Sequence, residues 1–318
     1  MTITLDDVAT ILGIPVISKV VSYPKLDDAV ARDLLVSALG VEDSDASLAL
    51  RDVRGQSVKL LWLKTKFSNL GDAPTVEKTT YAARAYLLYL LGSTLFIDKS
   101  GGRVSIDLLH VLQDLDTVHK YGWGVAALAT LYRHLGMASK SDCKQIAGYL
   151  TLLEAWVYEH FPMFQPPRKV GYVDVDPCVQ HWVPLKDQGS SLSHLYILRE
   201  ALDDLQSESV VWDPYSSIRA HHPLEEFAYY AGFLYCVDIV EPYQPDRCID
   251  HALKIGLPVL DLDRADACRD PTVLYGTICA IVRVLQGRAD AVEEGYTPDI
   301  DLMYSRANRR HCSGGSST

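Results

Sequence analysis

Residues 81–96 read YAARAYLLYLLGSTLF and carry the strongest structural signal in the chain. When this stretch is drawn as a helix of 3.6 residues per turn, apolar side chains fall on nearly every face, which is typical of a central, buried helix. The apolar run Ala85–Ile97 contains Gly92, Ser93 and Thr94 and falls well short of the roughly 20 residues that a bilayer-spanning helix needs. The stretch therefore predicts a helical core and no membrane span.

Helical periodicity continues on both sides of this stretch. N-terminal to it, helices are expected over Leu26–Leu39 and Val58–Phe67, whereas Thr2–Leu5 alternates in the way a short strand does. C-terminal to it, one helix is expected to be capped by Ser105 and another to run from Ser139 or Ser141 to His160. The remaining expected helices are Trp123–Leu135, Ser191–Leu205, Pro223–Val240, Asp246–Ile255 and Pro271–Leu285. The fold class is therefore predicted to be mainly α, a multi-helix globular domain with a few short N-terminal or connector strands.

A proline-rich segment from Pro166 to Pro184 interrupts this pattern. It has no helical period, so it is interpreted as an irregular connector, with a lobe boundary near 163–190 and short strands around Tyr172–Trp182. The expected organisation is a domain over residues 1–260, a helical extension over 261–305 and a disordered tail over 306–318.

Composition limits the class of protein. The chain has 318 residues, of which 48% are hydrophobic and 22% charged, so it can bury a core and is not globally disordered. Its formal net charge of −11 argues against a protein whose main task is to grip a phosphate backbone. Its seven irregularly spaced cysteines do not form a disulfide scaffold, and the acidic N-terminus carries no secretory signal. A soluble intracellular protein is expected.

The sequence offers little recognisable enzyme chemistry. The glycine-rich phosphate loops, the nucleophile elbow and the H-E-x-x-H metal motif are missing from it. Two C-x-x-H pairs, Cys178 with His181 and Cys248 with His251, could supply four zinc ligands, but a buried cysteine beside a hydrogen-bonded histidine is the commoner arrangement. No catalytic residue, cofactor or metal is therefore expected, and the four side chains are kept only as weak metal candidates.

A series of motifs, in order along the chain, resembles the plant mobile domain family, also called aminotransferase-like or MAIN-like. They are Thr2–Val8 with Leu12–Val16, Arg84–Phe96, Tyr121–Gly124, Leu131–Arg133, Gln145–Gly148, Leu152–Trp156, Glu159–Pro162, Trp212–Tyr215, and Pro245–Cys248 with Ile255–Gly256. The chain departs from the family pattern at Ile97, Glu154 and Pro242-Tyr243. The family carries a further N-terminal stretch before this first motif, so the resemblance implies that the extreme N-terminal segment is lacking here.

The resemblance implies a helical nuclear protein that acts in meristem maintenance and in transposon or gene silencing. It also implies protein partners, among them phosphatase-like nuclear proteins, and no membrane. Aminotransferase activity is not supported, because pyridoxal enzymes need a Schiff-base lysine in a large α/β fold and this chain shows no βαβ alternation. The leading hypothesis is a non-enzymatic interaction module. Its family-motif candidates for interaction are Trp123, Trp156, Trp212, Pro214, Tyr215, Asp246 and Arg247.

Two alternatives remain open at this point. A transposable-element-derived, nucleic-acid-associated protein would need a basic face built from Arg51, Arg54, Lys59, Lys64, Lys66 and the arginines near the C-terminus. A cryptic enzyme would need a pocket around Trp212 and Arg247. The developmental process, the identity of the partner and the oligomeric state lie beyond what the residues indicate.

Overall fold

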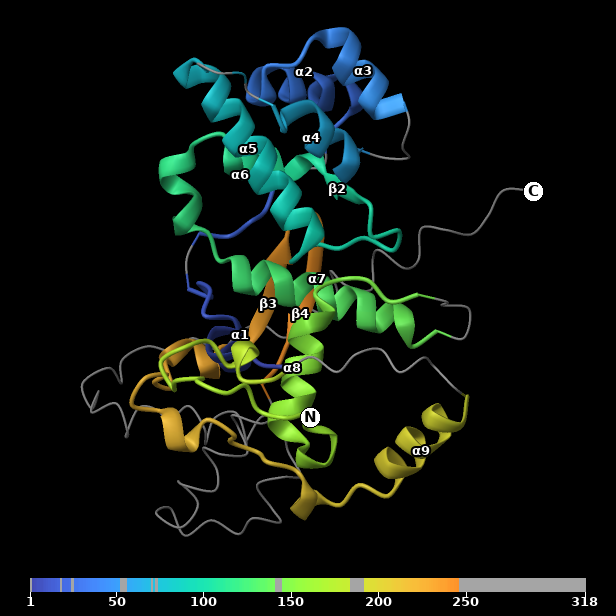
Figure 1. Ribbon diagram of the computed structural model, residues 1–318, viewed down its shortest axis with the longest axis vertical. Coiled ribbons are helices and arrows are strands. Elements are labelled where there is room, and N and C mark those ends of the chain that lie inside the picture. Colours follow the sequence, from blue (N-terminus) through green and yellow to red (C-terminus); the bar gives the residue numbers. More distant parts are fainter. Residues whose placement is uncertain are drawn as a thin grey trace, which may run out of the picture. The chain divides into compact units, whose positions relative to one another are not determined.

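The stretch that dominates the sequence forms the long helix α5 (Val76–Ser93) in a computed structural model of the protein (Figure 1). Thr75 caps the helix, because its side chain accepts a hydrogen bond from the backbone N–H of Lys78 at 3.3 Å. The prediction of a helix is confirmed, but the prediction that it is buried all round is wrong: Ala85, Leu88 and Gly92 are its buried residues. The other faces of α5 lie partly or wholly in solvent.

The structure describes residues 2–17, 19–23, 26–51, 56–69, 71, 74–140, 145–183 and 192–245, all of which belong to one unit, Met1–Ile249. Besides α5, the α-helices are α1 (Leu5–Leu12), α2 (Asp28–Leu39), α3 (Asp43–Arg51), α4 (Leu60–Phe67), α6 (Leu109–Leu112), α7 (Trp123–Ala138), α8 (Leu150–His160) and α9 (Leu192–Asp203). The strands are β1 (Ser57–Lys59), β2 (Arg103–Ser105), β3 (Gly232–Cys236) and β4 (Ile239–Tyr243). The short 3₁₀ helices are η1 (Ile106–Leu108), η2 (Leu115–Lys120), η3 (Pro162–Phe164), η4 (Cys178–Gln180), η5 (Ser207–Ser209), η6 (Ser216–Ile218) and η7 (Glu226–Tyr229).

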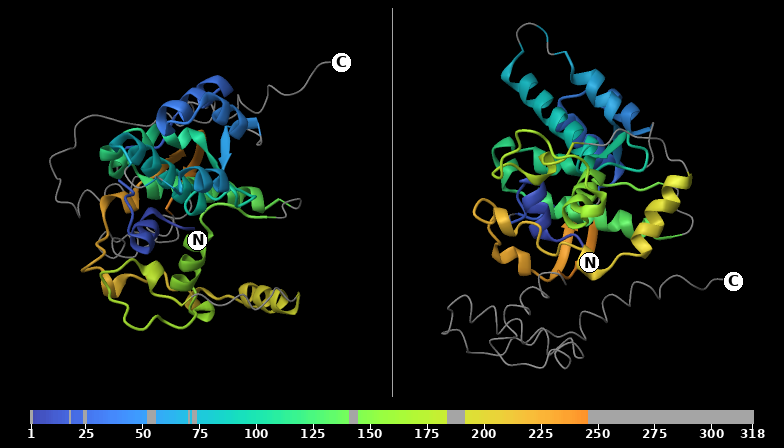
Figure 2. Two further views of the ribbon diagram at one scale, coloured as in Figure 1. Left: turned by 45° about the horizontal axis from the view of Figure 1, so that its top comes forward. Right: turned by 60° about the horizontal axis from the view of Figure 1, so that its bottom comes forward.

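The first half of the described residues packs α2, α4 and α6 against α5, and α3 packs on α2 and β1 (Figures 1 and 2). The antiparallel pair β1–β2 adds to this group, with Val58 opposite Val104. Gly92 of α5 is needed here, because a Cβ at this position would lie 2.5 Å from Cβ of Val104. The missing side chain therefore lets the helix approach the strand.

Helix α7 is the central element of the second half. Eight of its residues are buried, from Trp123 to Leu131, and it packs against α1 and against both strands of the antiparallel β3–β4 hairpin. The hairpin lies behind α7 in the view of Figure 1. Tyr243 of β4 is fully buried, and its hydroxyl accepts a hydrogen bond from the backbone N–H of Leu5 at 2.8 Å. The N-terminal helix is thereby held to the last described strand.

The mainly α fold class is confirmed, but several predicted elements are wrong. Thr2–Leu5 is not a strand: Thr4 caps α1 in a capping box with Asp7, so the helix begins at Leu5. The segment Pro223–Val240 is not a helix but forms η7 and the β3–β4 hairpin. Its Phe, Tyr, Val and Ile side chains favour strands once a buried surface is available for them, and that surface is α7.

Other predictions are confirmed, in full or in part. The helices predicted over Leu26–Leu39, Trp123–Leu135 and Ser191–Leu205 correspond to α2, α7 and α9. The helix predicted to end at His160 does so, but it begins only at Leu150. The connector strands are reduced to one antiparallel bridge, Arg168 with Trp182. Asp246–Ile255, Pro271–Leu285 and the regions 261–305 and 306–318 lie outside the described residues, so the domain boundaries predicted there stay predictions.

Among the helices that the structure describes, none combines the length and the apolar character that crossing a bilayer would require.

Candidate interaction site

The helical tryptophans of the family motifs are buried. Trp123, 8% exposed, donates a hydrogen bond from Nε1 to the carbonyl oxygen of Val118 at 2.8 Å, and its ring lies against those of Phe96 and Tyr121. Trp156 is also 8% exposed, and its ring contacts those of His160 and Phe161. Neither indole is available to a partner at the surface of the described residues.

The motif Trp212–Tyr215 is divided between surface and core. Tyr215 is fully buried, and its hydroxyl donates a hydrogen bond to Oδ1 of Asp7 at 2.9 Å. Trp212, three residues earlier, is 39% exposed. The motif therefore anchors its own segment through Tyr215 and leaves Trp212 reachable from solvent.

Asp7 of α1 is the centre of a buried polar network. Its Oδ2 accepts hydrogen bonds from the backbone N–H of Thr4 at 2.7 Å and from the Thr4 hydroxyl at 2.8 Å. Its Oδ1 contacts Nε2 of His160 at 3.0 Å and accepts the Tyr215 hydroxyl. Asp7 and His160 are both 0% exposed. A carboxylate buried to this degree is tolerated because donors surround it, and here they come from three distant parts of the sequence.

The ring of His160 faces an acceptor at each nitrogen. Nδ1 lies 2.6 Å from the carbonyl oxygen of Val211, which can only accept, so Nδ1 carries a proton. Nε2 faces the Asp7 carboxylate, which already receives N–H and O–H groups from Thr4 and Tyr215. This geometry commits both ring nitrogens of His160 to structural contacts.

Asp6, the residue before Asp7 in α1, extends the network through Arg219. Arg219 donates from Nη1 and Nη2 to the two carboxylate oxygens of Asp6 at 2.9 and 3.0 Å, and Nη2 also contacts Asp213 at 2.7 Å. Burial by itself lowers the pKa of Arg219, but the hydrogen bonds and charges of Asp6 and Asp213 outweigh it, so the pKa ends above its ordinary value. A two-pronged pair of this kind fixes the orientation of both partners.

Glu159, the residue before His160, holds the irregular connector, which we define as residues 166–183. The Nε1 of Trp182 donates to Oε1 of Glu159 at 2.7 Å, and Nδ1 of His181 lies 3.3 Å from the same oxygen. Burial raises the pKa of Glu159 to about 7, although the Trp182 hydrogen bond opposes the rise. Burial, with the charge of Arg168 next, lowers the pKa of His181.

Stacked rings and backbone hydrogen bonds complete the anchorage of the connector. His181 stacks on Tyr172 on one side and on Trp182 on the other, with ring centroids 4.5 Å apart in both pairs. The backbone N–H of Lys169 donates to the carbonyl oxygen of His181 at 2.8 Å. Nε2 of His222 meets the carbonyl oxygen of Asp174 at 2.9 Å. The segment is irregular in conformation, yet it is held at several points.

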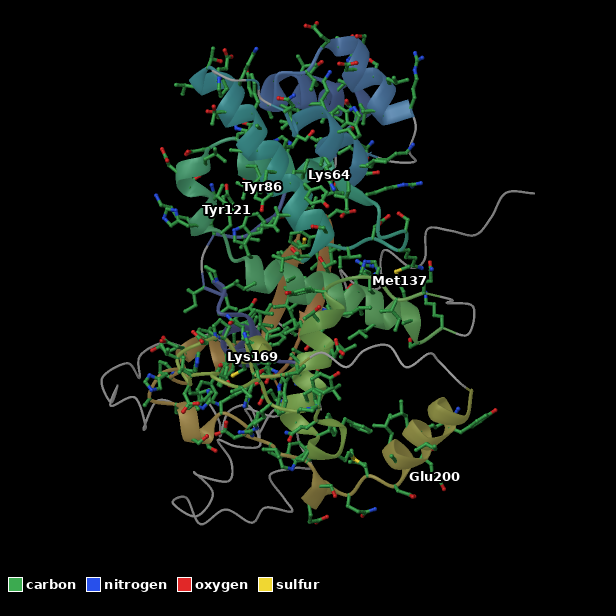
Figure 3. All side chains as sticks on the ribbon, in the orientation of Figure 1. Lys64, Tyr86, Tyr121, Met137, Lys169 and Glu200 are labelled. Carbon is green, nitrogen blue, oxygen red and sulfur yellow. The ribbon has the colours of Figure 1, made fainter. Side chains whose placement is uncertain are left out.

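The connector exposes three valines alongside charged residues such as Arg168, Lys169 and Asp174. Val170 is 98% exposed, Val175 63% and Val173 52%. Lys169 also belongs to this loop, which Figure 3 shows over the lower part of the view, in the region of α1. We call Val170, Val173 and Val175 the valine loop. Single exposed apolar residues are ordinary, but three within six positions on an anchored backbone make a local apolar surface.

Two of the four metal candidates, Cys178 and His181, lie within the described residues. Sγ of Cys178 lies 3.7 Å from the Tyr172 hydroxyl, and burial raises the pKa of this thiol to about 12. His181 is engaged by Glu159. In the ranges that the structure describes, no group of three or more His, Cys, Asp or Glu is placed to hold a metal ion. Cys248, His251, Asp246 and Arg247 lie outside those ranges, so a site that includes them stays a prediction.

The basic residues of the nucleic-acid alternative are also seen only in part. Lys66 forms an ion pair with Asp45, while Lys64 on α4 is exposed (Figure 3). Arg54 and the C-terminal arginines lie outside the described residues. In the described part of the proposed basic face, the charge of Lys66 is therefore already paired with an acidic residue, Asp45.

Sequence reasoning missed the residues that carry the network. Thr4, Asp7, Glu159 and His160 stand inside the family motifs, but the motifs indicate no role for them, and Arg219 stands outside every motif. One local signal was present, since T-x-x-D at Thr4–Asp7 has the spacing of a capping box. The contacts of Asp7 with His160 and Tyr215 span 153 and 208 positions, and no local pattern reports them.

Comparison with known proteins gives a consistent set of relatives. The family description "Plant mobile domain" matches residues 1–251. The chain is 36% identical to Protein MAIN-LIKE 1 of Arabidopsis thaliana over 255 residues, which are 78% of this chain and 48% of that protein. It is 36% identical to Protein MAINTENANCE OF MERISTEMS of the same plant over 215 residues, 68% of this chain and 43% of that protein.

A third relative carries an enzyme name. The chain is 33% identical to the Serine/threonine-protein phosphatase 7 long form homolog of Arabidopsis thaliana over 270 residues, which are 78% of this chain and 19% of that protein. The chain thus spans less than half the length of each of these relatives. No solved structure matches it.

Proposed function

The chain belongs to the plant mobile domain family, and from this we propose that it is a non-enzymatic nuclear interaction module that acts in meristem maintenance and in transposon or gene silencing through protein partners. The names of the relatives support the meristem role, since one of them is called MAINTENANCE OF MERISTEMS. The relative named as a phosphatase supports a phosphatase-like protein as one partner, because a domain similar to this chain occurs within it.

The observation that carries an interaction role is the valine loop. Its backbone is anchored to α8 through Glu159 and Trp182, so a partner would not have to order it on binding. Its apolar side chains already lie in water, and burying them against a partner would be favourable by about 25 cal/mol per Å² of apolar surface. A pre-ordered apolar surface is typical of protein-binding sites.

The buried histidine supports the non-enzymatic part of the proposal. His160 contacts an aspartate, as the histidine of a catalytic triad does, but it does so through Nε2, the nitrogen that a Ser-His-Asp triad turns to its serine. It is also fully buried, and its other nitrogen is used by Val211. A group with both nitrogens engaged in the core cannot exchange a proton with a substrate at the surface.

The test replaces two residues of the valine loop and measures which proteins no longer co-purify with the chain. The double variant Val170→Asp, Val175→Asp would be expressed as a tagged full-length protein in plant tissue, purified from nuclei and compared with the unaltered protein. We expect the nuclear partners of the unaltered protein to fall at least fivefold in the variant. Val76→Asp is the matched control, because Val76 is 86% exposed but lies at the start of α5, away from the connector.

Circular dichroism would establish that both variants keep the helical signal of the unaltered protein. If the double variant retains every partner that Val76→Asp retains, the valine loop is not the interaction surface. If the unaltered protein is absent from nuclei, the nuclear role fails with it.

A further inference from the structure

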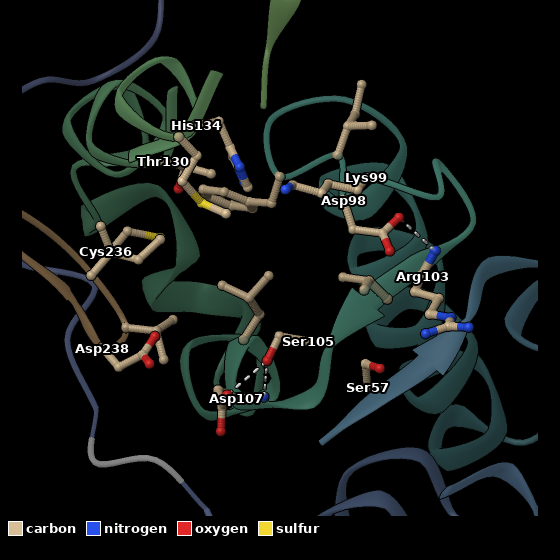
Figure 4. A pocket seen from close by; sticks show the side chains of 17 residues that line it. Ser57, Asp98, Lys99, Arg103, Ser105, Asp107, Thr130, His134, Cys236 and Asp238 are labelled. Carbon is tan, nitrogen blue, oxygen red and sulfur yellow. Dashed lines mark hydrogen bonds between the residues drawn. The ribbon is translucent and has the colours of Figure 1, made fainter. Parts of the chain in front are cut away.

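An open pocket of about 540 Å³ lies between four elements of the described residues (Figure 4). Helix α7 forms one wall, the loop after α5 and the β2–η1 segment form two more, and the β3–β4 turn forms the last. Its volume falls in the range of ~300–1,000 Å³ that is usual for ligand sites. No residue of the connector lines it, so this pocket is separate from the valine loop.

The pocket is mainly apolar. The side chains that give it this character are Phe96, Ile97, Val104, Leu108, Met137 and Ile239. An apolar occupant of the size of a large side chain would therefore be favoured, because such surfaces are wetted only at a cost in free energy.

His134 supplies an unsatisfied polar atom in this apolar wall. Its Nδ1 is buried and makes no hydrogen bond. Burial, together with the positive charges of Lys99 and Arg133, lowers the pKa of His134. Because almost none of the surface of Nδ1 is exposed, an occupant of the open pocket does not reach this atom, and His134 contributes to the wall through the rest of its ring.

The packing of the ring determines which way this atom faces. A Cβ built on Gly148 would lie 3.5 Å from Cδ2 of His134, so the Cδ2 edge of the ring faces Gly148. Nδ1 is on the opposite edge of the ring. Figure 4 shows His134 and Lys99 on the same side of the pocket and Asp238 across from them.

The charges of the pocket disfavour an anion. Three carboxylates, those of Asp98, Asp107 and Asp238, line it together with two cations, Lys99 and Arg103. Asp98 is occupied by the backbone N–H of Gly102 at 3.1 Å, and Asp107 by the hydroxyl of Ser105 at 2.7 Å. Asp238 and Lys99 stand on opposite sides, which suits an occupant with one donor and one acceptor.

Backbone strain marks the same pocket. Val237 has a φ of +55°, which β-branched residues rarely adopt. Its N–H donates to the carbonyl oxygen of Val21 at 2.6 Å, and this bond holds the turn in place. Strain of this kind clusters at functional sites.

We infer that this pocket binds an extended peptide segment of a partner protein through one bulky apolar side chain. That side chain fills the apolar part, a backbone carbonyl oxygen of the peptide accepts from Lys99, and a backbone N–H of the peptide donates to Asp238. A nucleotide phosphate meets three carboxylates, and a purely apolar ligand makes no use of Lys99 and Asp238. A peptide group satisfies both sides of the pocket.

Methionine methyl groups offer a direct readout of this binding. The protein has four methionines, of which Met137 lines the pocket and Met163 lies elsewhere in η3, 52% exposed. The full-length protein would be labelled with ¹³C-methyl methionine, and its methyl resonances followed by NMR while N-acetyl-L-phenylalanine N-methylamide is added. The same titration with N-acetyl-L-alanine N-methylamide tests the apolar side chain, and one with toluene tests the peptide group.

We expect the phenylalanine probe to shift Met137 in a saturable way and to leave Met163 in place. The alanine probe and toluene should each bind at least fivefold more weakly. Lys99→Gln should weaken the phenylalanine probe at least threefold, whereas Lys140→Gln, a change at another exposed lysine, should not alter it. An unmoved Met137 overturns the site. Equal binding of toluene, or an unchanged affinity in Lys99→Gln, overturns the peptide assignment.

Discussion

Replacing Asp7 by alanine removes the centre of the buried network that joins three distant segments. The carboxylate accepts two hydrogen bonds from Thr4, one from Tyr215 and one from His160. Without it the imidazole of His160, which is 0% exposed, loses its anionic partner. The substitution therefore tests whether the network holds α1 to α8 and to the segment of Tyr215.

The expected loss is large compared with a single surface hydrogen bond. Removing the carboxylate leaves several buried groups without an acceptor at about 1–3 kcal/mol each, so a total of about 3–5 kcal/mol is expected. That is a fifth or more of the ~5–15 kcal/mol that stabilises an ordinary folded protein. With a slope of about 3 kcal/mol per molar urea, the unfolding midpoint should fall by ~1–2 M.

Urea unfolding of the full-length protein, followed by tryptophan fluorescence, measures this shift. Asp33→Ala is the matched control, because the Asp33 side chain is 74% exposed and its loss should change the free energy of unfolding by less than ~0.5 kcal/mol. Combining Asp7→Ala with His160→Phe should cost less than the sum of the two single changes by about 1–3 kcal/mol, since the second change removes the stranded group.

The reasoning is refuted if Asp7→Ala and Asp33→Ala shift the midpoint equally. It is also refuted if the two changes in the double variant add without coupling, because a direct contact between the two side chains requires that they do not.

Two further outcomes follow from the structure. Burial raises the pKa of Glu159 from 4.5 to about 7, so the Glu159 carboxyl binds a proton more tightly in the folded protein than in the unfolded protein. The stability gained from this protonation is complete below pH 4.5 and is lost as the pH rises through 7. Glu159→Gln should therefore gain on the unaltered protein by about 3 kcal/mol between pH 4.5 and 8 in urea unfolding, and a constant difference would exclude this. Gly40→Ala should lower the free energy of unfolding by about 2–4 kcal/mol, because φ is +62° and the new Cβ would lie 2.2 Å from the ring of Tyr81. Gly101→Ala, with φ +63° and open space, should cost only ~1–2 kcal/mol in the same assay, and equal losses would show that Tyr81 moves freely.

The sequence predicted the fold class and the elements whose signals are local. Helix α2 has Asp27 at its N-cap and Gly40 in the left-handed conformation after its last turn, and both signals lie within the helix and its flanks. Helix α7 is confirmed for the same reason, since Val125, Leu128, Leu131 and Leu135 recur with the helical period within its own sequence. The prediction of a helix over Pro223–Val240 was wrong because the apolar residues of this segment suit a strand as well as a helix. The choice between the two depends on packing against α7.

The candidate site was predicted less well than the fold. Tyr215 was named as a motif residue, but its role as an anchor for Asp7 could not be read from the motif. Trp123 and Trp156 were also named, and both are buried. The valine loop was recognised only as an irregular segment, because its exposure depends on Glu159 holding Trp182 from outside it.

By itself, the sequence determined a helical protein of the plant mobile domain family, since helical periodicity, caps and ordered motifs are properties of neighbouring residues. The tertiary structure alone decided what the polar residues do. Asp7 and His160 are separated by 153 positions, yet they meet at 3.0 Å, both fully buried. Burial changes the energy of a charge more than any neighbour in sequence does, and burial exists only after the protein has folded.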